Sequence, residues 1–356
     1  MELHDFMCPE VCPDTRRLRD DPALLAAYAP STLMVADFEA DRLFHQPQRP
    51  AGPVFTSAIR GVDLDAALAP VRNKTHRARE LVAQLDALGA RWAVADMTDA
   101  APFAPEFYLG FAANILQYNR RRGQRSAALW RLPLYYEPSA KLGNWLDPDA
   151  TDEIDFADKL PRVYWRGATS AARWTTPYRS MQASLPQTFE ELVAQKETSL
   201  RAAAVLYSFE NRDFTDIRFG LRPRYFRQLT RAARRGGFAA GREPPTEAFR
   251  HRYVLCLPGN DVATQLYWVI ATRSVAFVVE SDYECLPDYF LKPWVHYVPI
   301  QRNLGDLREK FEFCEANPDL CRAISERARI AYAAIRDPAL WHESELKVLD
   351  KLGFLA

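Results

Sequence analysis

The 356-residue sequence has no excess of either charge, no long apolar run and no closely spaced cysteine pair. Lys plus Arg and Asp plus Glu both number 46, so no global field attracts nucleic acid and any electrostatic function must lie in local patches. No segment approaches the roughly 20 apolar residues of a membrane span. The six cysteines form no CxxC motif, so we expect free thiols in a reducing compartment.

Segment 1–14 also lacks the basic start and apolar stretch of a signal peptide. We therefore expect a cytoplasmic protein, at most in peripheral contact with the inner face of the cytoplasmic membrane. Two Asp-x-Asp motifs are present, but Asp63-Leu64-Asp65 opens a predicted helix and Asp147-Pro148-Asp149 lies in a predicted linker. We expect neither motif to bind a metal, and no internal repeat or low-complexity segment occurs.

The rest of the composition is that of a folded protein. A hydrophobic fraction of 48% predicts a substantial core, and the length fits two domains with a boundary near residue 145. Strands alternate with helices along the chain, which favours an α/β fold. Before the boundary we expect strands at 32–38, 53–59, 92–95 and 127–136, and helices at 78–88 and 107–118. After it we expect a strand at 163–165 and helices at 189–207, 303–316, 318–335 and 341–352.

Segment 252–299 is the most informative part of the chain. An apolar strand at 253–257 stops at the turn Pro258-Gly259-Asn260-Asp261, an amphipathic helix follows to about residue 272, and a second strand covers 275–279. Such a unit points the free N–H groups of the helix N-terminus at a ligand above the strand ends. The pattern therefore indicates a nucleotide or nucleotide-sugar site.

Two more motifs flank this segment, Trp165-Arg166-Gly167 upstream and the run LKPWVHYVP at 291–299 downstream. Together they resemble glycosyltransferase family 90, which includes Rumi-type protein O-glucosyltransferases and bacterial lipopolysaccharide-modifying enzymes. The form GNDVAT-x-L-x-W at 259–268 is similar to the bacterial branch. The resemblance covers about residues 160–335.

The resemblance implies GT-B architecture, with two Rossmann-like domains facing a cleft. It implies an acceptor domain at 1–145, a donor domain at 146–335 and a C-terminal helix at 336–356 that crosses back. The implied reaction is the inverting transfer of a hexose or pentose from a UDP-sugar to a hydroxyl of a lipopolysaccharide core or related glycan. No metal or other cofactor is expected beyond the UDP-sugar co-substrate.

Two arginines beside small residues are candidates for phosphate binding. Arg166 and Arg173 flank Gly167 and Thr169, and a guanidinium can grip a phosphate with two hydrogen bonds. From the residues alone, a structural ion pair for Arg166 and a surface position for Arg173 are equally good interpretations. The resemblance assigns Arg166, Gly167 and Arg173 to the donor pocket.

The turn and the predicted helix after it supply further donor-site candidates, Gly259, Asn260, Asp261 and Thr264. Asp261 is alternatively the N-cap of that helix. Eukaryotic family members carry Ser-x-Arg in this helix, whereas this chain has Gln265, which donates hydrogen bonds but no charge. Arg252 or Arg273 is then expected to supply the missing cation. Glu284 follows the second strand and is a candidate for accepting hydrogen bonds from ribose or sugar hydroxyls.

The candidate general base is Asp96, which follows the predicted strand at 92–95. The resemblance supports it, because related enzymes place an aspartate at such a strand end. Asp99 is the rival, and the competing interpretation is that Asp96 caps a turn while Asp99 is solvated. An aspartate in water is a weak base, so its site would have to raise its pKa.

A basic segment at 218–242 holds eight arginines and no acid. A helix at 225–235 would place several of them on one face, which suits a phosphate-bearing acceptor or an anionic membrane surface. A solvated face is the alternative, and nucleic acid is not expected because aromatic residues are sparse there. The candidates are Arg224, Arg227, Arg231, Arg234 and Arg235. Rival functions are a capsule or protein O-glycosyltransferase, or a non-catalytic nucleotide-sugar or nucleic-acid-binding protein.

Overall fold

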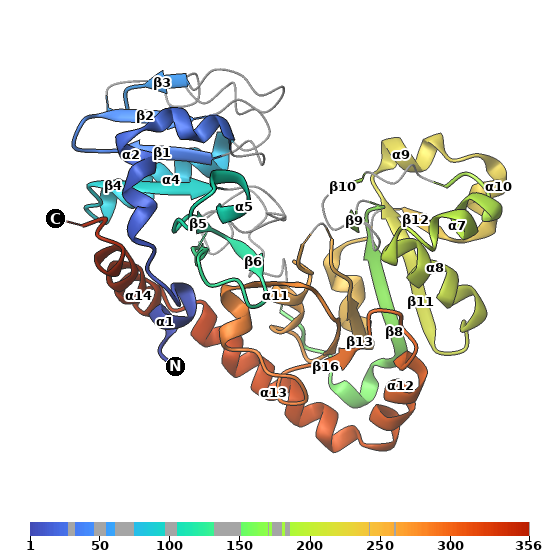
Figure 1. Cartoon of the computed structure of the whole chain (residues 1–356). Coiled ribbons are helices and arrows are strands. Elements are labelled where there is room, and N and C mark those ends of the chain that lie inside the picture. Colours follow the sequence, from blue (N-terminus) through green and yellow to red (C-terminus); the bar gives the residue numbers. More distant parts are fainter. Residues whose placement is uncertain are drawn as a thin grey trace. The chain divides into compact units, whose positions relative to one another are not determined.

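The computed structural model describes residues 1–27, 33–45, 55–60, 75–96, 105–131, 151–169, 171–172, 180–181, 186–241, 243–259 and 261–355. The chain divides into two compact units (Figure 1). Unit 1 comprises Met1–Asn144, Tyr283–Tyr289 and Asp337–Ala356, and unit 2 comprises Trp145–Asp282 and Phe290–Arg336. The first break lies next to the boundary expected near residue 145.

Unit 1 contains a six-stranded mixed sheet in the order β3-β2-β1-β4-β5-β7. Its first three strands are antiparallel neighbours, and β1 also runs antiparallel to β4, whereas β4, β5 and β7 are parallel. A Rossmann-like domain has a mainly parallel sheet, whereas the described sheet of unit 1 is mixed, so a Rossmann-like fold for unit 1 stays a prediction. The strands are β1 (Leu33–Asp37), β2 (Arg42–His45), β3 (Phe55–Ser57), β4 (Trp92–Asp96), β5 (Leu116–Gln117) and β7 (Ala128–Leu129).

Short helices and a second small sheet complete unit 1. The helix expected at 107–118 is only α5, and residues 116–117 form a strand instead. The reason is Gly110, which has a φ of 73° and so ends the helix in the left-handed conformation. The other elements are α1 (Leu3–Met7), α2 (Arg17–Asp20), α4 (Thr75–Ala87), α5 (Pro105–Leu109) and the pair β6 (Asn119–Arg121) and β15 (Tyr283–Cys285), with 3-10 turns at Pro13–Arg16, Pro22–Ala27 and Leu286–Tyr289.

The last helix, α14 (Pro338–Lys351), belongs to unit 1 and packs against α1 (Figure 1). Its buried Glu345 accepts hydrogen bonds from Arg131 at 2.9 and 3.1 Å and from Gln84 at 2.9 Å. Burial raises the pKa of Glu345, and Arg131 acts in the opposite direction. Because breaking a buried pair is costly, these bonds hold α14 on the first unit.

Unit 2 is built on a six-stranded parallel sheet in the order β12-β11-β8-β13-β14-β16. The chain runs from β8 outward to β12, and then crosses to the other side of β8 to form β13 and the strands beyond it. This is the Rossmann order, with its topological switch point between β8 and β13. The strands are β8 (Leu160–Gly167), β11 (Thr215–Leu221), β12 (Ala239–Gly241), β13 (His251–Cys256), β14 (Val275–Val279) and β16 (Val298–Ile300).

The helices of unit 2 broadly follow the predicted pattern, but two of the expected helices are each split in two. The helix expected at 189–207 is two helices, because Ser199 caps the second one by accepting from the amide of Ala202. The helix expected at 225–235 is also two, with a break at Leu229–Thr230. The helices are α7 (Phe189–Gln195), α8 (Leu200–Glu210), α9 (Pro223–Gln228), α10 (Arg231–Gly236), α11 (Leu266–Val269), α12 (Leu307–Ala316) and α13 (Pro318–Ile335). Short elements are β9 (Ala171–Ala172), β10 (Ser180–Met181) and 3-10 turns at Phe156–Asp158 and Pro245–Arg250.

The apolar run at 253–257 is continuous because both faces of β13 are covered. Tyr253 and Leu255 lie in the larger core cluster, together with residues of α8, α12 and α13. Val254 and Cys256 point to the opposite face and pack with residues of α11. Buried parallel strands have this unbroken apolar pattern because neither face meets water.

All six cysteines of the chain are buried and free. Across the described ranges, the helices are too short or too polar to traverse a lipid bilayer.

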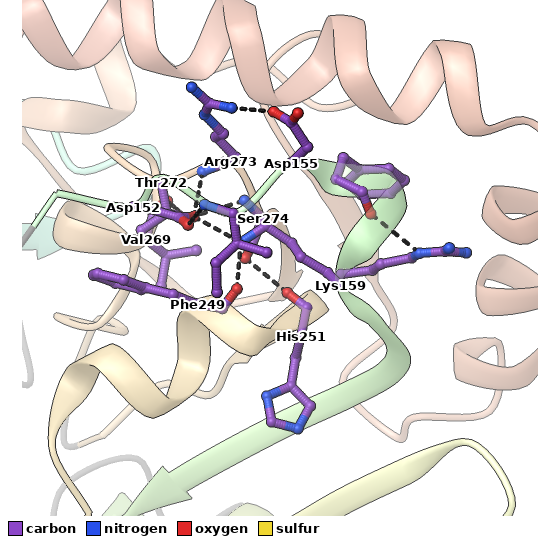
Figure 2. A network of polar contacts seen from close by, with 12 residues as sticks. Asp152, Asp155, Lys159, Phe249, His251, Val269, Thr272, Arg273 and Ser274 are labelled. Carbon is purple, nitrogen blue, oxygen red and sulfur yellow. Dashed lines mark hydrogen bonds and ion pairs between the residues drawn. The ribbon is translucent and has the colours of Figure 1, made fainter.

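A buried ion pair joins three segments of unit 2 at the amino edge of the sheet (Figure 2). The Lys159 ammonium donates to Asp152 at 2.7 Å and to the carbonyl of Phe249, and both charged side chains are almost fully inaccessible. Asp152 also accepts from the backbone amide of Arg273 at 2.8 Å. Burial lowers the pKa of Lys159, and the contact with Asp152 opposes this. The pair therefore links the start of unit 2 to β13 and β14.

Replacing Asp152 by Ala is expected to lower the free energy of unfolding by about 3–5 kcal/mol, because Lys159 would keep a buried charge without its partner. The matched control is Asp155→Ala, since Asp155 is 70% exposed and binds the exposed guanidinium of Arg273. That change should cost no more than about 1 kcal/mol. Urea unfolding followed by circular dichroism measures both values. A cost for Asp152→Ala as small as that of the control would contradict a structural role for the buried pair.

Candidate functional site

The carboxyl ends of β8 and β13 lie side by side at the switch point of unit 2. β8 ends with Arg166-Gly167, and β13 runs into Leu257-Pro258-Gly259. In open parallel sheets, ligands bind outside the carboxyl ends of the strands at such a point. The sheet therefore brings together two of the motifs that the sequence singled out, although about 90 residues of chain separate them.

Packing explains the glycine in each of these two motifs. A Cβ atom on Gly167 would lie 2.3 Å from the ring of Trp165, so no side chain fits there. A Cβ atom on Gly259 would lie 3.2 Å from Nη2 of Arg201. The amide of Gly259 donates to the carbonyl of Val262 at 3.3 Å, which closes the turn. The two glycines thus let the Trp165 ring and the Arg201 guanidinium pack closely against the backbone at the switch point.

Arg201 spans the two strand ends and was missed by the sequence analysis. Its guanidinium donates to the carbonyl of Ala168 at 2.9 Å and to that of Pro258 at 3.3 Å, and it lies 5.6 Å from the ring of Trp165. It makes no ion pair with any carboxylate in the described part of the chain. Burial lowers the pKa of Arg201 to about 10, against the attraction of Asp261, so it is charged at neutral pH.

One sequence signal could have pointed to Arg201. Ser199 is a good N-cap, and Arg201 is the second residue of the helix that it starts. A cation in the first turn opposes the helix dipole and costs a few tenths of a kcal/mol to about 1 kcal/mol. A basic residue there needs another reason, but only the folded sheet shows that the side chain reaches Pro258.

Arg166 is engaged by carboxylates on one face of the sheet. Its Nη2 donates to Asp216 at 2.8 Å, its Nε lies 2.9 Å from Glu243, and the guanidinium lies 4.5 Å from the ring of Tyr164. This is the structural ion pair that was the alternative interpretation of this residue. Asp216 and Glu243 already neutralise the charge of Arg166. A role for Arg166 in phosphate binding stays a prediction.

The turn after β13 does not present the helix N-terminus that the sequence predicted. α11 begins only at Leu266, and Asp261 accepts instead from the amide of the next residue, Val262, at 2.6 Å. Because that local bond competes with helix formation, the first half of the predicted helix is a turn. Asp261 is therefore not the N-cap of α11. Gln265 is the N-cap residue, and its side chain makes no capping hydrogen bond. Thr264 and Gln265 are both half-buried.

Arg252 and Arg273 lie at the amino edge of the sheet, away from the turn they were predicted to complete. Arg252 is the second residue of β13 and pairs with Glu315 at 2.8 Å, and Arg273 precedes β14 and binds Asp155. All strands of a parallel sheet start at one edge, so neither side chain lies beside Gly259. Arg166 and Arg201 are described cations at the switch point, and of these two Arg201 is the one without a carboxylate partner among the described residues.

The motif LKPWVHYVP at 291–299 makes a tight turn at the same amino edge, before β16. The amide of Trp294 donates to the carbonyl of Tyr297 at 2.7 Å, and His296 Nδ1 accepts from the amide of Lys292 at 2.9 Å. Trp294 has a φ of 61°, which is unusual for a bulky residue. The histidine therefore holds the turn closed.

Two of the predicted site residues belong to unit 1. Glu284 lies on β15 and pairs with the buried Arg120 at 2.7 Å. Asp96 is the last residue of β4 and is only 1% exposed. It lies at the carboxyl end of the parallel strands β4 and β5, where α/β proteins commonly place catalytic groups. The roles of Glu284 and Asp96 stay predictions, and Asp99, Arg173 and Asn260 lie outside the described residues.

The basic segment does not form one helical face, because α9 and α10 are separate helices. Arg227, Arg231 and Arg235 have exposed side chains, and Arg224 and Arg234 lie on the same two helices. A contact with an acceptor or membrane stays a prediction for this segment. Within the described ranges, no three His, Cys, Asp or Glu side chains are grouped closely enough to hold a metal. Both Asp-x-Asp motifs lie outside those ranges.

The sheet order and the two glycine motifs at its switch point define unit 2 as a Rossmann-like α/β unit. The model of glycosyl transferase family 90 matches residues 147–333, which is more than half of the chain and nearly all of unit 2. The chain therefore belongs to glycosyltransferase family 90, as its motifs predicted.

Three relatives named as O-glucosyltransferases share shorter segments with this chain. It is 37% identical over 81 residues to O-glucosyltransferase LpsA of Dichelobacter nodosus, which covers 22% of this chain and 26% of the relative. It is 49% identical over 81 residues to protein O-glucosyltransferase 1 of Rattus norvegicus, 22% of this chain and 20% of that protein. It is 30% identical over 103 residues to protein O-glucosyltransferase 3 of Mus musculus, 29% and 20% of the two chains. The chain thus spans about a quarter or less of these relatives.

Proposed function

We propose that this chain is a glycosyltransferase that moves a hexose or pentose from a UDP-sugar to a hydroxyl of a glycan such as a lipopolysaccharide core. The observation that carries the proposal is the switch point of unit 2, where two family motifs meet and Arg201 bridges them. Membership of family 90 and the names of the relatives support glycosyl transfer. The GT-B arrangement that the family implies is part of the proposal.

The proposed donor site holds the diphosphate at the carboxyl ends of β8 and β13. The backbone at Gly167 and Gly259 would lie next to the phosphate oxygens, and the close packing at Gly259 brings the Arg201 guanidinium to the same place. Arg201 lies beside them with a charge that no described carboxylate neutralises, so it can stabilise the negative charge that develops on the leaving UDP. In this role Arg201 takes the place of the arginine that eukaryotic family members carry where this chain has Gln265.

In the proposed reaction, Asp96 takes the proton of the acceptor hydroxyl and the oxygen attacks the anomeric carbon. The bond from that carbon to the diphosphate oxygen breaks in the same step, which inverts the configuration. A positioned base typically accelerates such a step by about 100- to 10,000-fold. Asp99 is the alternative base.

A donor screen tests the proposal. Incubation with UDP-glucose, UDP-galactose and UDP-xylose is expected to release UDP from one of them faster than from the others, and faster still with a suitable glycan acceptor. If the chain releases UDP from none of these donors but still binds UDP, it is the non-catalytic nucleotide-sugar-binding protein that was the rival interpretation.

Removal of metal ions should leave transfer unchanged. Leaving-group stabilisation is assigned to Arg201, and the reaction as proposed uses no divalent cation. The measurement is the initial rate of UDP release after treatment with EDTA, compared with the rate after adding Mg²⁺ or Mn²⁺. A loss of activity that either ion restores would show that a metal takes part, and would remove this role from Arg201.

A further inference from the structure

A positively charged cavity lies on unit 2, and its lining includes none of the residues assigned to the switch point. It has a volume of about 220 Å³ and is lined by β8, β11, the end of α8 and the turn before β12. Arg162 and Thr215 lie near the amino ends of their strands, whereas Gly167 lies at the carboxyl end of β8. The lining residues are Arg162, Ser208, Phe209, Arg212, Thr215, Asp216, Ile217, Arg218 and Gly237.

The cavity exists because β12 is short. β12 pairs only with residues 219–221 of β11, so it leaves the amino half of the β11 edge uncovered. α8 runs beside this edge (Figure 1). The Ser208 hydroxyl on α8 accepts a hydrogen bond from the backbone amide of Ile217 at 3.1 Å, so this amide of the strand edge has a partner. The Ser208 hydroxyl also lies 2.8 Å from that of Thr215. The exposed strand edge is thus closed by side chains and is not available for pairing with another strand.

The lining carries more positive than negative charge. Asp216 is the one acid among the lining residues, and its two oxygens lie 2.8 Å from Arg166 and 2.8 Å from Arg218. Burial would raise the pKa of Asp216, but these guanidinium groups outweigh burial and hold the pKa below its ordinary value. Arg162 and Arg212 form no ion pair with a described carboxylate. Two cations are therefore left to act on a ligand.

Arg212 is held in place by an aromatic ring. Its guanidinium lies 4.4 Å from the centre of the Phe209 ring, and Phe209 packs edge-on against Phe189 at 5.5 Å. Because the stacked guanidinium loses little freedom on binding, it can offer two parallel N–H groups to an oxyanion at low entropic cost. Phe209 adds an apolar wall beside that charge.

We propose that this cavity binds a phosphate monoester group through Arg162 and Arg212, with Phe209 packing against the rest of the ligand. A phosphate carries charge close to −2 at neutral pH and matches the fork of a guanidinium, whereas a carboxylate offers half that charge. A volume near 220 Å³ lies below the usual 300–1,000 Å³ of small-molecule pockets, so a phosphorylated monosaccharide fits better than a whole nucleotide-sugar. The proposal does not depend on glycosyl transfer at the switch point.

The experiment is an isothermal titration calorimetry measurement at low salt, in which the intact chain is titrated with inorganic phosphate and, separately, with glucose 1-phosphate. Arg162→Gln/Arg212→Gln should weaken phosphate binding about tenfold or more, because two charge-assisted hydrogen bonds are lost. The matched control, Arg250→Gln/Arg322→Gln, removes two surface charges of unit 2 that already have carboxylate partners, and should change binding less than about twofold. Arg162→Lys/Arg212→Lys should restore part of the affinity.

Arg201→Gln separates this site from the switch point and should leave phosphate binding at the cavity intact. Sedimentation with vesicles containing phosphatidic acid distinguishes the two sources of the phosphate group. If the native chain pellets with the vesicles and the Arg162→Gln/Arg212→Gln variant does not, the ligand is a lipid headgroup. If the native chain does not pellet, the ligand is a soluble phosphate ester. The proposal is overturned if the native chain binds no phosphate. It is also overturned if the Arg162→Gln/Arg212→Gln variant, folded by circular dichroism, binds phosphate as tightly as the native chain.

Discussion

Asp96→Asn is expected to reduce sugar transfer by about 100- to 10,000-fold while leaving the affinity for UDP unchanged. The amide keeps the shape of the side chain but cannot take the proton of the acceptor hydroxyl. The leaving diphosphate is assigned to unit 2, so its binding should not respond. The measurements are kcat for transfer and the dissociation constant for UDP.

Asp37→Asn provides the matched control for this change. Asp37 ends β1, is also buried, and pairs in register with Trp92, at the far end of β4 from Asp96. It accepts from Arg19 at 2.8 and 3.0 Å, so the substitution should lower stability and spare kcat. Undiminished turnover of Asp96→Asn would remove Asp96 from the role, and a large loss in Asp99→Asn would then assign the base to the rival residue.

Arg201→Gln is expected to lower kcat/KM by about 100- to 1,000-fold, the usual cost of losing one group that stabilises developing negative charge. UDP affinity should fall as well, since the product carries the same diphosphate. Arg201→Lys keeps the charge but not the two-pronged geometry that reaches both Ala168 and Pro258, so it should recover only part of the activity. Steady-state kinetics and UDP titration measure both effects.

Two further variants show whether the loss is specific to Arg201. Arg250 is an exposed arginine of unit 2 paired with Glu247 at 3.0 Å, and Arg250→Gln should leave the kinetics unchanged. Arg252→Gln tests the cation that the sequence suggested. If Arg252→Gln lowers kcat/KM more than Arg201→Gln, the diphosphate is not held at the carboxyl ends of β8 and β13, and the assignment of Arg201 fails.

Local pattern predicted the regular elements of unit 2 well. The strand at 275–279 and the helix at 318–335 have the predicted bounds, because a buried apolar run and a proline-started amphipathic helix are signals carried by neighbouring residues. The family and the two glycine motifs were also evident from the sequence, and the parallel sheet then placed those motifs on adjacent strands.

Two kinds of feature could not be predicted from the sequence: those in which a side chain competes with the backbone for a hydrogen bond, and those that depend on tertiary packing. The helix predicted after Gly259 was longer than the observed one, because the Asp261 side chain accepts a hydrogen bond from the amide of Val262. Such a local bond leaves no trace in the spacing of apolar residues. Arg201 lies 35 residues after Arg166 in the chain, and only the packing of α8 against β11 brings its side chain to Pro258. The mixed sheet of unit 1 rests on short strands such as β5 and β7, whose pairing direction is not written in their composition.

The most direct test of the donor site is a residue-resolved UDP titration. We expect UDP to shift the backbone amide signals of Gly167, Ala168 and Gly259 in the NMR spectrum of the isotope-labelled chain, saturably and with one dissociation constant. Amide signals at the amino edge, such as those of Arg252 and Arg273, should remain in place. UDP binding that leaves Gly167 and Gly259 unshifted, or no saturable binding of UDP, would contradict a donor site at the switch point of unit 2.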